Sequence, residues 1–179
     1  YYDLPGSVAA GMTDSKALDY QAGMEKGLTL TLAGLSGGNM VYEAAGMMSS
    51  LMATSFEAMV MDNEIIGAAQ RTLRGIEVSD DTLSFDVIAD VCLRGPNHYL
   101  GHVQTLQRME SEFLYPQVAD RQSLSDWHAA GKPGIRDHAR RKVREILSRH
   151  TTPVANDAAI RACFPVALPG SVFGPPTRW

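Results

Sequence analysis

An aromatic ring and a carboxylate stand side by side at Tyr42 and Glu43, at the end of a short segment of β-prone residues. A quaternary ammonium ion has no proton to donate, so a protein attracts it with a ring face and a negative charge. In a parallel α/β barrel, residues at the carboxyl ends of the strands line the active site. We therefore predict a cation-binding site at this pair, with an ordinary salt bridge between strand and loop as the alternative.

Two further polar residues, Gln21 and Glu25, lie one helical turn apart in a segment with helical periodicity. At about 100° per residue, they share a stripe with Asp14, Leu18, Leu28 and Leu32. The apolar half of this stripe should face the core, which places the polar pair on the inward side. A buried carboxylate is costly unless it is hydrogen-bonded. We therefore predict an internal Gln21–Glu25 hydrogen bond, a stripe that surfaces at its amino end, or a polar site at a barrel mouth.

Asp62 departs from the polar pattern of the next helical segment, residues 55–73. Glu57, Glu64 and Arg71 are spaced seven apart and form the predicted solvent-facing stripe. Asp62 lies about 140° away from that stripe, among apolar residues. It is therefore predicted to be partly buried, where it either accepts a hydrogen bond from a neighbouring segment or orients a residue of the site.

His98 and His102 are four residues apart near the expected start of a helix, so they could share one face. Two histidines at this spacing can bind zinc when a third ligand is present. Tyr99 stands where a metalloprotease motif has glutamate. Hydrogen-bonding roles are therefore favoured over metal binding, and the turn Gly95–Asn97 would hold the segment in a defined geometry.

Charge and composition exclude several classes of protein. The chain carries a net charge of -4 with a pI near 5.7, which argues against a nucleic-acid binder. No apolar stretch is long enough for a membrane helix.

Cys92 and Cys163 lie in apolar contexts, which predicts buried free thiols and a reducing cytoplasm. The basic run 136–149 is predicted to be a solvated helix face or a contact for an acidic partner, and Trp127 is predicted to be a packing residue.

The elements that position these residues follow from periodicity, caps and breakers. We expect strands at residues 7–10 and 39–43 and helices at residues 15–35, 55–73, 79–92, 99–115, 124–130, 133–150 and 156–163. Strand, helix, strand and then many helices is the order at the end of a parallel α/β barrel. A mostly helical domain explains the same periodicity.

Taken in order, several segments resemble the trimethylamine methyltransferase family, called MttB-like. These segments are Thr13–Lys16, Asp19–Glu25, Gly37–Gly46, Glu57 with Asp62–Glu64, Gly75–Val78, His98–His102 with Thr105, Tyr115–Pro116 with Asp120–Arg121, and Trp127 followed by Gly131. The resemblance covers residues from about 7 to 165 and is carried by the ordered series rather than by one motif.

The resemblance implies an α/β fold in which this chain is the C-terminal portion of a (β/α)8 TIM-type barrel, predominantly helical with two short parallel strands. Residues 1–165 would belong to the barrel, and residues 166–179 would form an extended tail rich in proline and glycine. The chain begins Tyr1-Tyr2-Asp3 without methionine, which agrees with a fragment that is inactive alone.

The activity implied by the resemblance is methyl transfer from a quaternary or tertiary amine, betaine-like or trimethylamine, to the cobalt of a corrinoid protein. The corrinoid would be carried by that partner, so this chain would bind no cofactor directly. Founding members of the family use pyrrolysine, whereas residues 101–105 look like the branch without it, which favours a quaternary amine. The expected state is a cytoplasmic homo-oligomer with no nucleic-acid or membrane partner.

Roles within the site are hypotheses that follow from this chemistry. Tyr42, Glu43 and Tyr99 would bind the ammonium group, whereas Gln21, Glu25, His98 and His102 would orient the rest of the substrate. No catalytic residue and no metal ligand is assigned, because the cobalt itself is the nucleophile. Two alternatives stay open: a non-catalytic docking segment for a corrinoid protein or second subunit, and a zinc hydrolase built on the two histidines.

Overall fold

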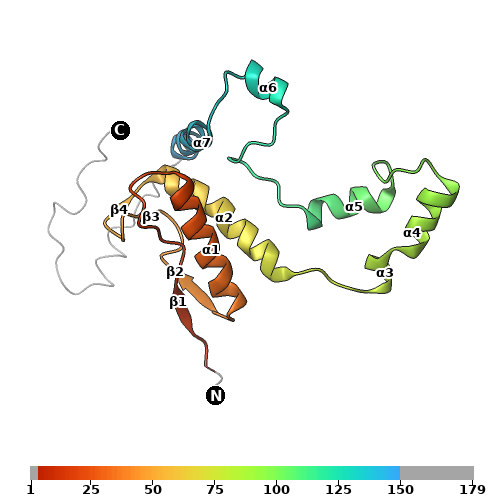
Figure 1. Ribbon diagram of the computed structural model, residues 1–179, viewed down its shortest axis with the longest axis horizontal. Helices are drawn as coiled ribbons and strands as arrows, with labels where there is room; N and C mark the ends of the chain where they lie inside the picture. The colour runs from red at the N-terminus through yellow and green to blue at the C-terminus, as the bar shows by residue number, and fades with distance from the viewer. Residues whose placement is uncertain (1–3, 150–179) are drawn as a thin grey trace, which may run out of the picture. The chain divides into compact units, whose positions relative to one another are not determined.

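The computed structural model describes residues 4–149 of the 179-residue chain. The elements, labelled in Figure 1, are β1 (Ser7–Ala9), α1 (Tyr20–Leu35), β2 (Met40–Tyr42), β3 (Met47–Met48), β4 (Ala53–Thr54), α2 (Phe56–Arg74), α3 (Asp80–Leu83), α4 (Phe85–Ala89), the π-helical turn η1 (Asp90–Arg94), α5 (Val103–Glu112), α6 (Leu124–Ala129) and α7 (Ile135–Arg149). Residues 4–145 belong to one compact unit of the chain, and the last residues of α7 lie beyond its boundary. The helix expected at residues 156–163 and the tail at 166–179 lie outside the described residues.

β1, α1 and β2 form a strand–helix–strand unit with parallel strands, as the sequence predicted. The register places Val8 opposite Val41 and Ala9 opposite Tyr42. A parallel strand of this kind is typically buried on both faces, but Met40 and Tyr42 of β2 are 61% and 47% exposed in the described residues. Side chains alternate along a strand, and only the intervening Val41 packs against the core. A short antiparallel pair, β3 with β4, was not predicted.

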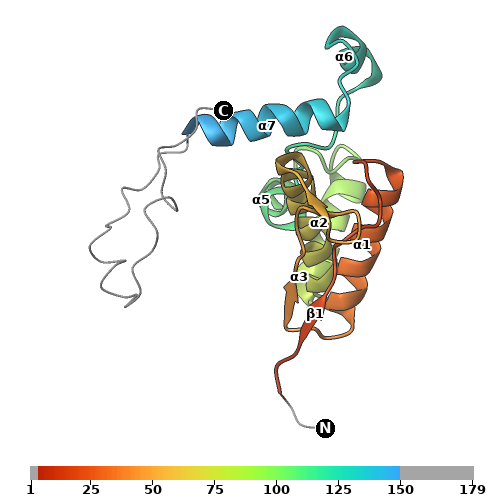
Figure 2. The same ribbon diagram turned by 90° about the vertical axis from the view of Figure 1, so that its left-hand side faces the viewer.

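The core of this unit lies between α1 and α2, which run side by side in Figures 1 and 2. Its buried residues are Ala10, Leu30, Ala33 and Ala69, with Val8, Val41, Ala44, Ile65 and Ile66 packed against them. The helices approach closely at Gly34, where an added Cβ would lie 2.3 Å from the Cδ1 atom of Leu73. A larger residue at Gly34 would therefore have to displace that side chain.

Helix α1 begins five residues later than predicted, at Tyr20 instead of Ser15. Asp19 caps it by accepting a hydrogen bond from Ala22 N–H (3.0 Å), and the hydroxyl of Ser15 donates to the same carboxylate (2.9 Å). These local bonds hold residues 15–19 in a loop, since short polar side chains compete with helical bonding.

The inward face of α1 also differs from the predicted stripe. Leu28 and Leu32 are 57% and 55% exposed, whereas the buried residues are Ala22, Lys26, Leu30 and Ala33. The buried face of α1 is thus made of two alanines, one leucine and one lysine. Gly27 and Gly34 lie next to Ile65 and Leu73 of α2. Periodicity of large apolar residues therefore selected the wrong side of the helix.

Helix α2 has the predicted bounds within a residue, with Ser55 as N-cap and Gly75 as C-cap. Its predicted solvent stripe is wrong in part. The Glu64 carboxylate accepts hydrogen bonds from the backbone N–H groups of residues 117–119. Arg71 donates to the carbonyl oxygen (2.8 Å) and the carboxylate (3.0 Å) of Glu112. These two residues connect α2 to later segments.

The later helices follow the predicted caps more closely than the predicted lengths. Ser79 forms a capping box with Thr82, as its position indicated, but Ser84 (φ 55°) breaks the expected helix 79–92 into α3, α4 and η1. Helix α5 starts at Val103, so His98 and Tyr99 precede it. The predictions of α6 and α7 are confirmed within a few residues.

Two other expectations concern the cysteines and membranes. Cys92 is exposed, so its predicted burial is wrong, and Cys163 lies outside the described residues. The segment around Cys92 has apolar neighbours that are themselves exposed, such as Leu93. Among residues 4–149, none of the helices is both long and apolar enough to span a bilayer.

Gly11 is required for two reasons, which a pair of substitutions can separate. It has φ +86°, and an added Cβ would lie 2.7 Å from the carbonyl oxygen of Ala44, whereas Gly37 has φ +85° with open space around it. We predict that Gly37→Ala lowers the free energy of unfolding by about 1 kcal/mol. Gly11→Ala should lower it by about 2–4 kcal/mol, because the backbone clash adds to the φ strain.

Urea unfolding of the intact protein measures both losses, and Gly6→Ala provides the control, since Gly6 has neither a positive φ nor a neighbour within 4 Å. Equal losses at Gly11 and Gly37 would show that the contact with Ala44 is unimportant.

Candidate functional site

The loops that follow β1 and β2 meet at the carboxyl ends of the two parallel strands. Ser50 N–H donates to the carbonyl oxygen of Thr13 (3.2 Å), and the Ser50 hydroxyl donates to the carboxylate of Asp14 (2.6 Å). Ligands of parallel α/β proteins bind outside the carboxyl ends of the strands. The edge formed by residues 10–19 and 43–55 is therefore the candidate functional site.

Glu25 connects α1 to the first of these loops. Its carboxylate accepts hydrogen bonds from the Thr13 hydroxyl (2.5 Å), the Gln21 amide (2.8 Å) and the Asp14 N–H (2.9 Å). These bonds lower the pKa of Glu25 below its usual value, and the bond from Thr13 has the largest effect. The predicted Gln21–Glu25 hydrogen bond is present, but it is exposed and not internal, with Gln21 exposed and Glu25 half-buried. Glu25 is therefore an anion that fixes the loop at the site edge.

A buried ion pair lies beneath both loops. The Lys26 ammonium is 2.6 Å from the Asp62 carboxylate, and each residue is only 1% exposed. Lys26 also donates to the carbonyl oxygen of Gly11 (3.1 Å), in the first loop. Asp62 also accepts from the N–H of Gly46 (2.7 Å), in the second loop. The prediction that Asp62 accepts a bond from a neighbouring segment is confirmed, and its partners join α1, α2 and both loops.

The electrostatics of this pair are governed by its burial. Desolvation raises the pKa of Asp62, while the hydrogen bonds from Lys26 and Gly46 oppose that rise. Two charges removed from water are tolerated only when each is paired and its remaining bonding capacity is used. The backbone groups of Gly11 and Gly46 supply those additional bonds.

The predicted cation-binding pair lies at the same edge of the strands. Tyr42 ends β2 and is half-exposed, and Glu43 follows it with φ 61°, fully on the surface. Within residues 4–149, Glu43 forms no hydrogen bond and no ion pair, so the alternative of a salt bridge to a loop is not realised there. A free carboxylate thus lies next to an accessible aromatic ring.

Tyr99, His98 and His102 belong to a different segment, before α5. The Tyr99 hydroxyl is 3.4 Å from the sulfur of Cys92, and this contact raises the pKa of Tyr99. His102 is the N-cap of α5, and its Nδ1 accepts from the N–H of Gln104 (3.2 Å). In the described part of the chain, no bond joins these three residues to Tyr42 or Glu43, so their shared role stays a prediction.

The zinc hypothesis gains no support from the geometry. Because His98 lies outside α5 and His102 caps it, the two do not share a helix face as predicted. Over residues 4–149, no three side chains of histidine, cysteine, aspartate or glutamate gather as metal ligands. The Nδ1 atom of His102 is already an acceptor for backbone N–H.

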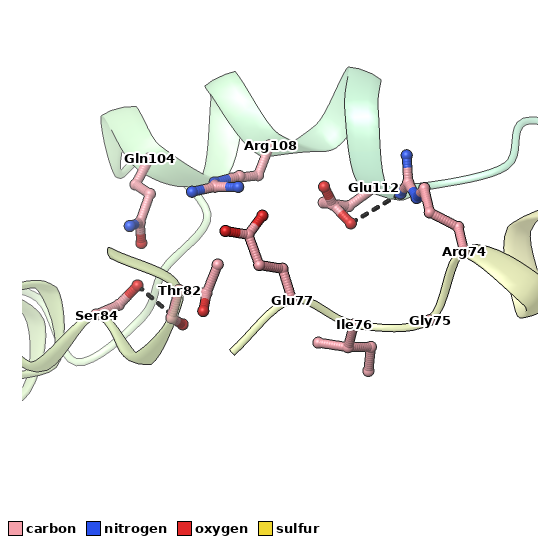
Figure 3. Close-up of a pocket in the computed structure, with 9 residues that line it drawn as sticks. All are labelled: Arg74, Gly75, Ile76, Glu77, Thr82, Ser84, Gln104, Arg108 and Glu112. Atoms are coloured by element: carbon pink, nitrogen blue, oxygen red, sulfur yellow. Dashed lines mark hydrogen bonds and ion pairs between the residues drawn. The ribbon is translucent and has the colours of Figure 1, made fainter. Parts of the chain in front are cut away.

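A larger hollow, of about 570 Å³, lies between the end of α2, α3 and α5, and Figure 3 shows its lining. Its charged residues are Arg74, Glu77, Arg108 and Glu112. Arg74 pairs with Glu112 (2.9 Å), Arg108 pairs with Asp81, and the Glu77 side chain points toward Arg108 in the view. Because these charges compensate one another, the hollow holds no excess charge that would select a ligand.

Sequence reasoning missed Lys26 and Thr13, which hold the edge of the site together. A signal for Lys26 was present, because it shares a helix face with Ala22, Leu30 and Ala33, where a lysine needs a buried counter-charge. Asp62, singled out as a carboxylate among apolar residues, was that counter-charge. Linking them required the packing of α1 on α2.

A parallel strand–helix–strand unit places the chain among the α/β proteins. Many proteins of this class bind ligands at the carboxyl ends of their strands. A sequence model of the family described as trimethylamine methyltransferase (MTTB) matches residues 1–163. The chain belongs to this family, as its ordered segments predicted.

Individual relatives agree with this assignment. The chain is 37% identical over 158 residues to the trimethylamine methyltransferase MttB of Methanosarcina barkeri strain Fusaro. The matched region covers 88% of this chain and 31% of that protein. It is 34% identical over 166 residues to the glycine betaine methyltransferase of Desulfitobacterium hafniense strain Y51, covering 90% of this chain and 34% of the relative. The latter agrees with the predicted branch without pyrrolysine. The chain spans about a third of the length of these relatives.

The hydrogen bonds to Glu25 make the stability of the site edge depend on pH. A lowered pKa in the folded state stabilises the fold above the pKa of the unfolded carboxyl group, and this contribution is lost as pH falls through the folded-state pKa. We predict that Glu25→Gln is less stable than the wild type at neutral pH and that the difference disappears on acidification. Urea midpoints of both proteins between pH 7 and strongly acidic pH measure this.

Glu110→Gln is the matched control, since Glu110 is an exposed helical glutamate without a hydrogen bond or ion pair within residues 4–149. A Glu25→Gln deficit that stays constant with pH would contradict the proposed electrostatic origin.

Removing one partner of the buried pair should destabilise the protein strongly. Asp62→Asn leaves the Lys26 ammonium buried without a counter-charge, and we predict a loss of about 3–5 kcal/mol in the free energy of unfolding. The double variant Lys26→Met with Asp62→Leu should lose clearly less than the sum of the single variants, because no charge remains buried. Chemical denaturation of the intact protein gives all three values.

An exposed ion pair, Arg94 with Asp90, provides the comparison. Asp90→Asn should cost less than about 1 kcal/mol. A similar small loss for Asp62→Asn would show that the buried pair is not critical.

Proposed function

We propose that this chain is part of an enzyme that transfers a methyl group from a quaternary or tertiary amine to the cobalt of a corrinoid protein. The observation that carries the proposal is membership of the trimethylamine methyltransferase family over residues 1–163. The names of the relatives, trimethylamine methyltransferase and glycine betaine methyltransferase, support an N-methylated amine as substrate. The free carboxylate at the strand edge adds a residue suited to a cation.

We further propose that the unit β1–α1–β2 is the C-terminal portion of a (β/α)8 barrel. Consecutive parallel strands joined by a helix are the repeating unit of that fold. The side chains of α1 that point away from α2, among them Leu28 and Leu32, are exposed in the described residues. In a barrel, other β/α units of the protein would cover such surfaces and pair with the open strand edges.

In this proposal, Tyr42 and Glu43 bind the substrate ammonium. The ring face and the carboxylate attract the cation without a hydrogen bond, which suits a quaternary amine with no N–H. Tyr42 is half-exposed and Glu43 has no competing partner in the described residues, so both are available to a ligand. Glu25 differs, because three donors already occupy its carboxylate. Its proposed role is to hold the loop of Thr13 and Asp14 in place.

The corrinoid acts as the methyl acceptor and supplies the nucleophile. The methyl carbon would form its new bond to the acceptor while the electron pair of the C–N bond stays on nitrogen. A quaternary ammonium would then leave as a neutral tertiary amine, and a tertiary amine that is protonated in solution would leave as a neutral secondary amine. The protein residues need only bind the cation, exclude water and align the methyl group with the acceptor. Because the nucleophile would come from the corrinoid, the site on this protein can consist of a ring, a carboxylate and polar loops without a covalent catalyst.

The test of the cation site uses Glu43→Gln in the intact enzyme. We predict that the dissociation constant for the methylated amine rises by about tenfold, because an attractive charge is lost while the shape is kept. Tyr42→Leu should weaken binding similarly, whereas Tyr42→Phe should bind nearly as the wild type, since the ring face is kept. Binding is measured by calorimetry, and methyl transfer is measured with the corrinoid protein across a panel of methylated amines.

Glu110→Gln again serves as the control for loss of a surface carboxylate. If Glu43→Gln bound and demethylated the amine normally, Glu43 would have no role in binding the cation. If no methylated amine in the panel were demethylated by the wild type, the proposed activity itself would be wrong.

A further inference from the structure

A second hollow, of about 250 Å³, is lined by part of the candidate site edge, by the start of α2 and by the start of α7. Its basic residues are Lys16, Arg136 and Arg140, which come from the first site loop and from α7. Glu57 of α2 is the acidic residue of the lining. The hydroxyl residues Thr54 and Ser55 precede α2, and Leu18 and Met48 form part of an apolar wall.

The charges of this hollow are not balanced. Glu57 accepts a long hydrogen bond from Arg140 (3.4 Å), which compensates one cation. Arg136 forms no hydrogen bond and no ion pair within residues 4–149, and Lys16 donates to a neutral acceptor, the carbonyl oxygen of Asp14 (2.7 Å). In the larger hollow of Figure 3, by contrast, both arginines are paired with acidic residues. Unpaired basic residues therefore distinguish the smaller hollow from the larger one.

The placement of Arg136 also opposes the stability of its own helix. It lies in the first turn of α7, where the helix dipole is positive and a cation is unfavourable. Arg140 follows one turn later, and like charges four residues apart in a helix repel each other. Pairing with Glu57 accounts for Arg140. Asp137 is the acid of the same first turn, but Arg136 forms no ion pair within residues 4–149, so local pairing does not explain its position at the hollow. A bound anion would relieve the cost of placing Arg136 at this helix start and its repulsion with Arg140.

We propose that this hollow binds a phosphate group. The guanidinium group of Arg136 presents parallel N–H donors that match two oxygens of a phosphate, and the Lys16 ammonium adds a point charge. The Thr54 hydroxyl forms no hydrogen bond within the described residues, so it is free to donate. The volume accommodates a phosphate with a small organic part against Leu18 and Met48, and it is below that of a site for a large ligand.

The first experiment titrates inorganic phosphate into the intact protein at low ionic strength, in a buffer free of other oxyanions, by calorimetry. We expect saturable binding that weakens by at least about tenfold in Arg136→Gln and in Arg140→Gln. Arg141→Gln and Arg144→Gln are the matched controls, because they are exposed arginines of α7 that do not line the hollow. The controls should bind phosphate as the wild type does.

Equal weakening in all four variants would show only a general effect of charge and would overturn the site. The same holds if phosphate does not bind, or if acetate binds and phosphate does not. A second measurement needs no variant: phosphate should protect Arg136 of the wild type from modification by phenylglyoxal, relative to Arg141, as read by mass spectrometry. Equal protection or none would also overturn the proposal. These outcomes do not depend on amine demethylation.

Discussion

The buried pair of Lys26 and Asp62 is the interaction on which the arrangement of the described site depends. Each charge makes one further hydrogen bond to a backbone group, Lys26 to the carbonyl oxygen of Gly11 and Asp62 to the N–H of Gly46. Buried charges are tolerated when they are paired and receive additional hydrogen bonds of this kind. The packing of α1 on α2 and the paths of the two site loops therefore depend on each other. A change in either would leave a buried charge without its partner.

This coupling constrains the sequence of the loops. Both backbone partners of the pair are glycines with φ +86°, and a Cβ at either position would lie 2.7 Å from a neighbouring oxygen. Glu25 then fixes the same first loop from the side by accepting from Thr13 and Asp14. Residues at the carboxyl edge of the strands are thus held by bonds made below the surface. The side chains of Tyr42 and Glu43, at the same edge, form no hydrogen bond or ion pair within the described residues.

The sequence predicted best what is decided locally. Ser55 and Ser79 mark helix starts and Gly75 an end because caps and breakers act on their immediate neighbours. The predicted start of α1 at residue 15 was wrong because Asp19 caps the helix and the residues before it are held in a loop. Its inward face was wrong because packing against α2 favours small side chains. The Lys26–Asp62 pair could not be predicted, since its partners are 36 residues apart and meet only through that packing.

The exposure of the proposed cation pair bears on the proposed barrel. A cation–ring contact contributes little in open water and more when solvent is excluded. In the described residues Tyr42 is half-exposed, at the open edge of a two-stranded sheet. The apolar side chains of α1 that face away from α2 are exposed as well. If further β/α units cover the apolar face of α1 and the open edge of the sheet, the same packing would bury that face and exclude water from the Tyr42 ring. The barrel proposal and the cation-site proposal therefore support each other, because Tyr42 and Glu43 can hold an ammonium ion strongly only in the enclosed edge that the barrel would provide.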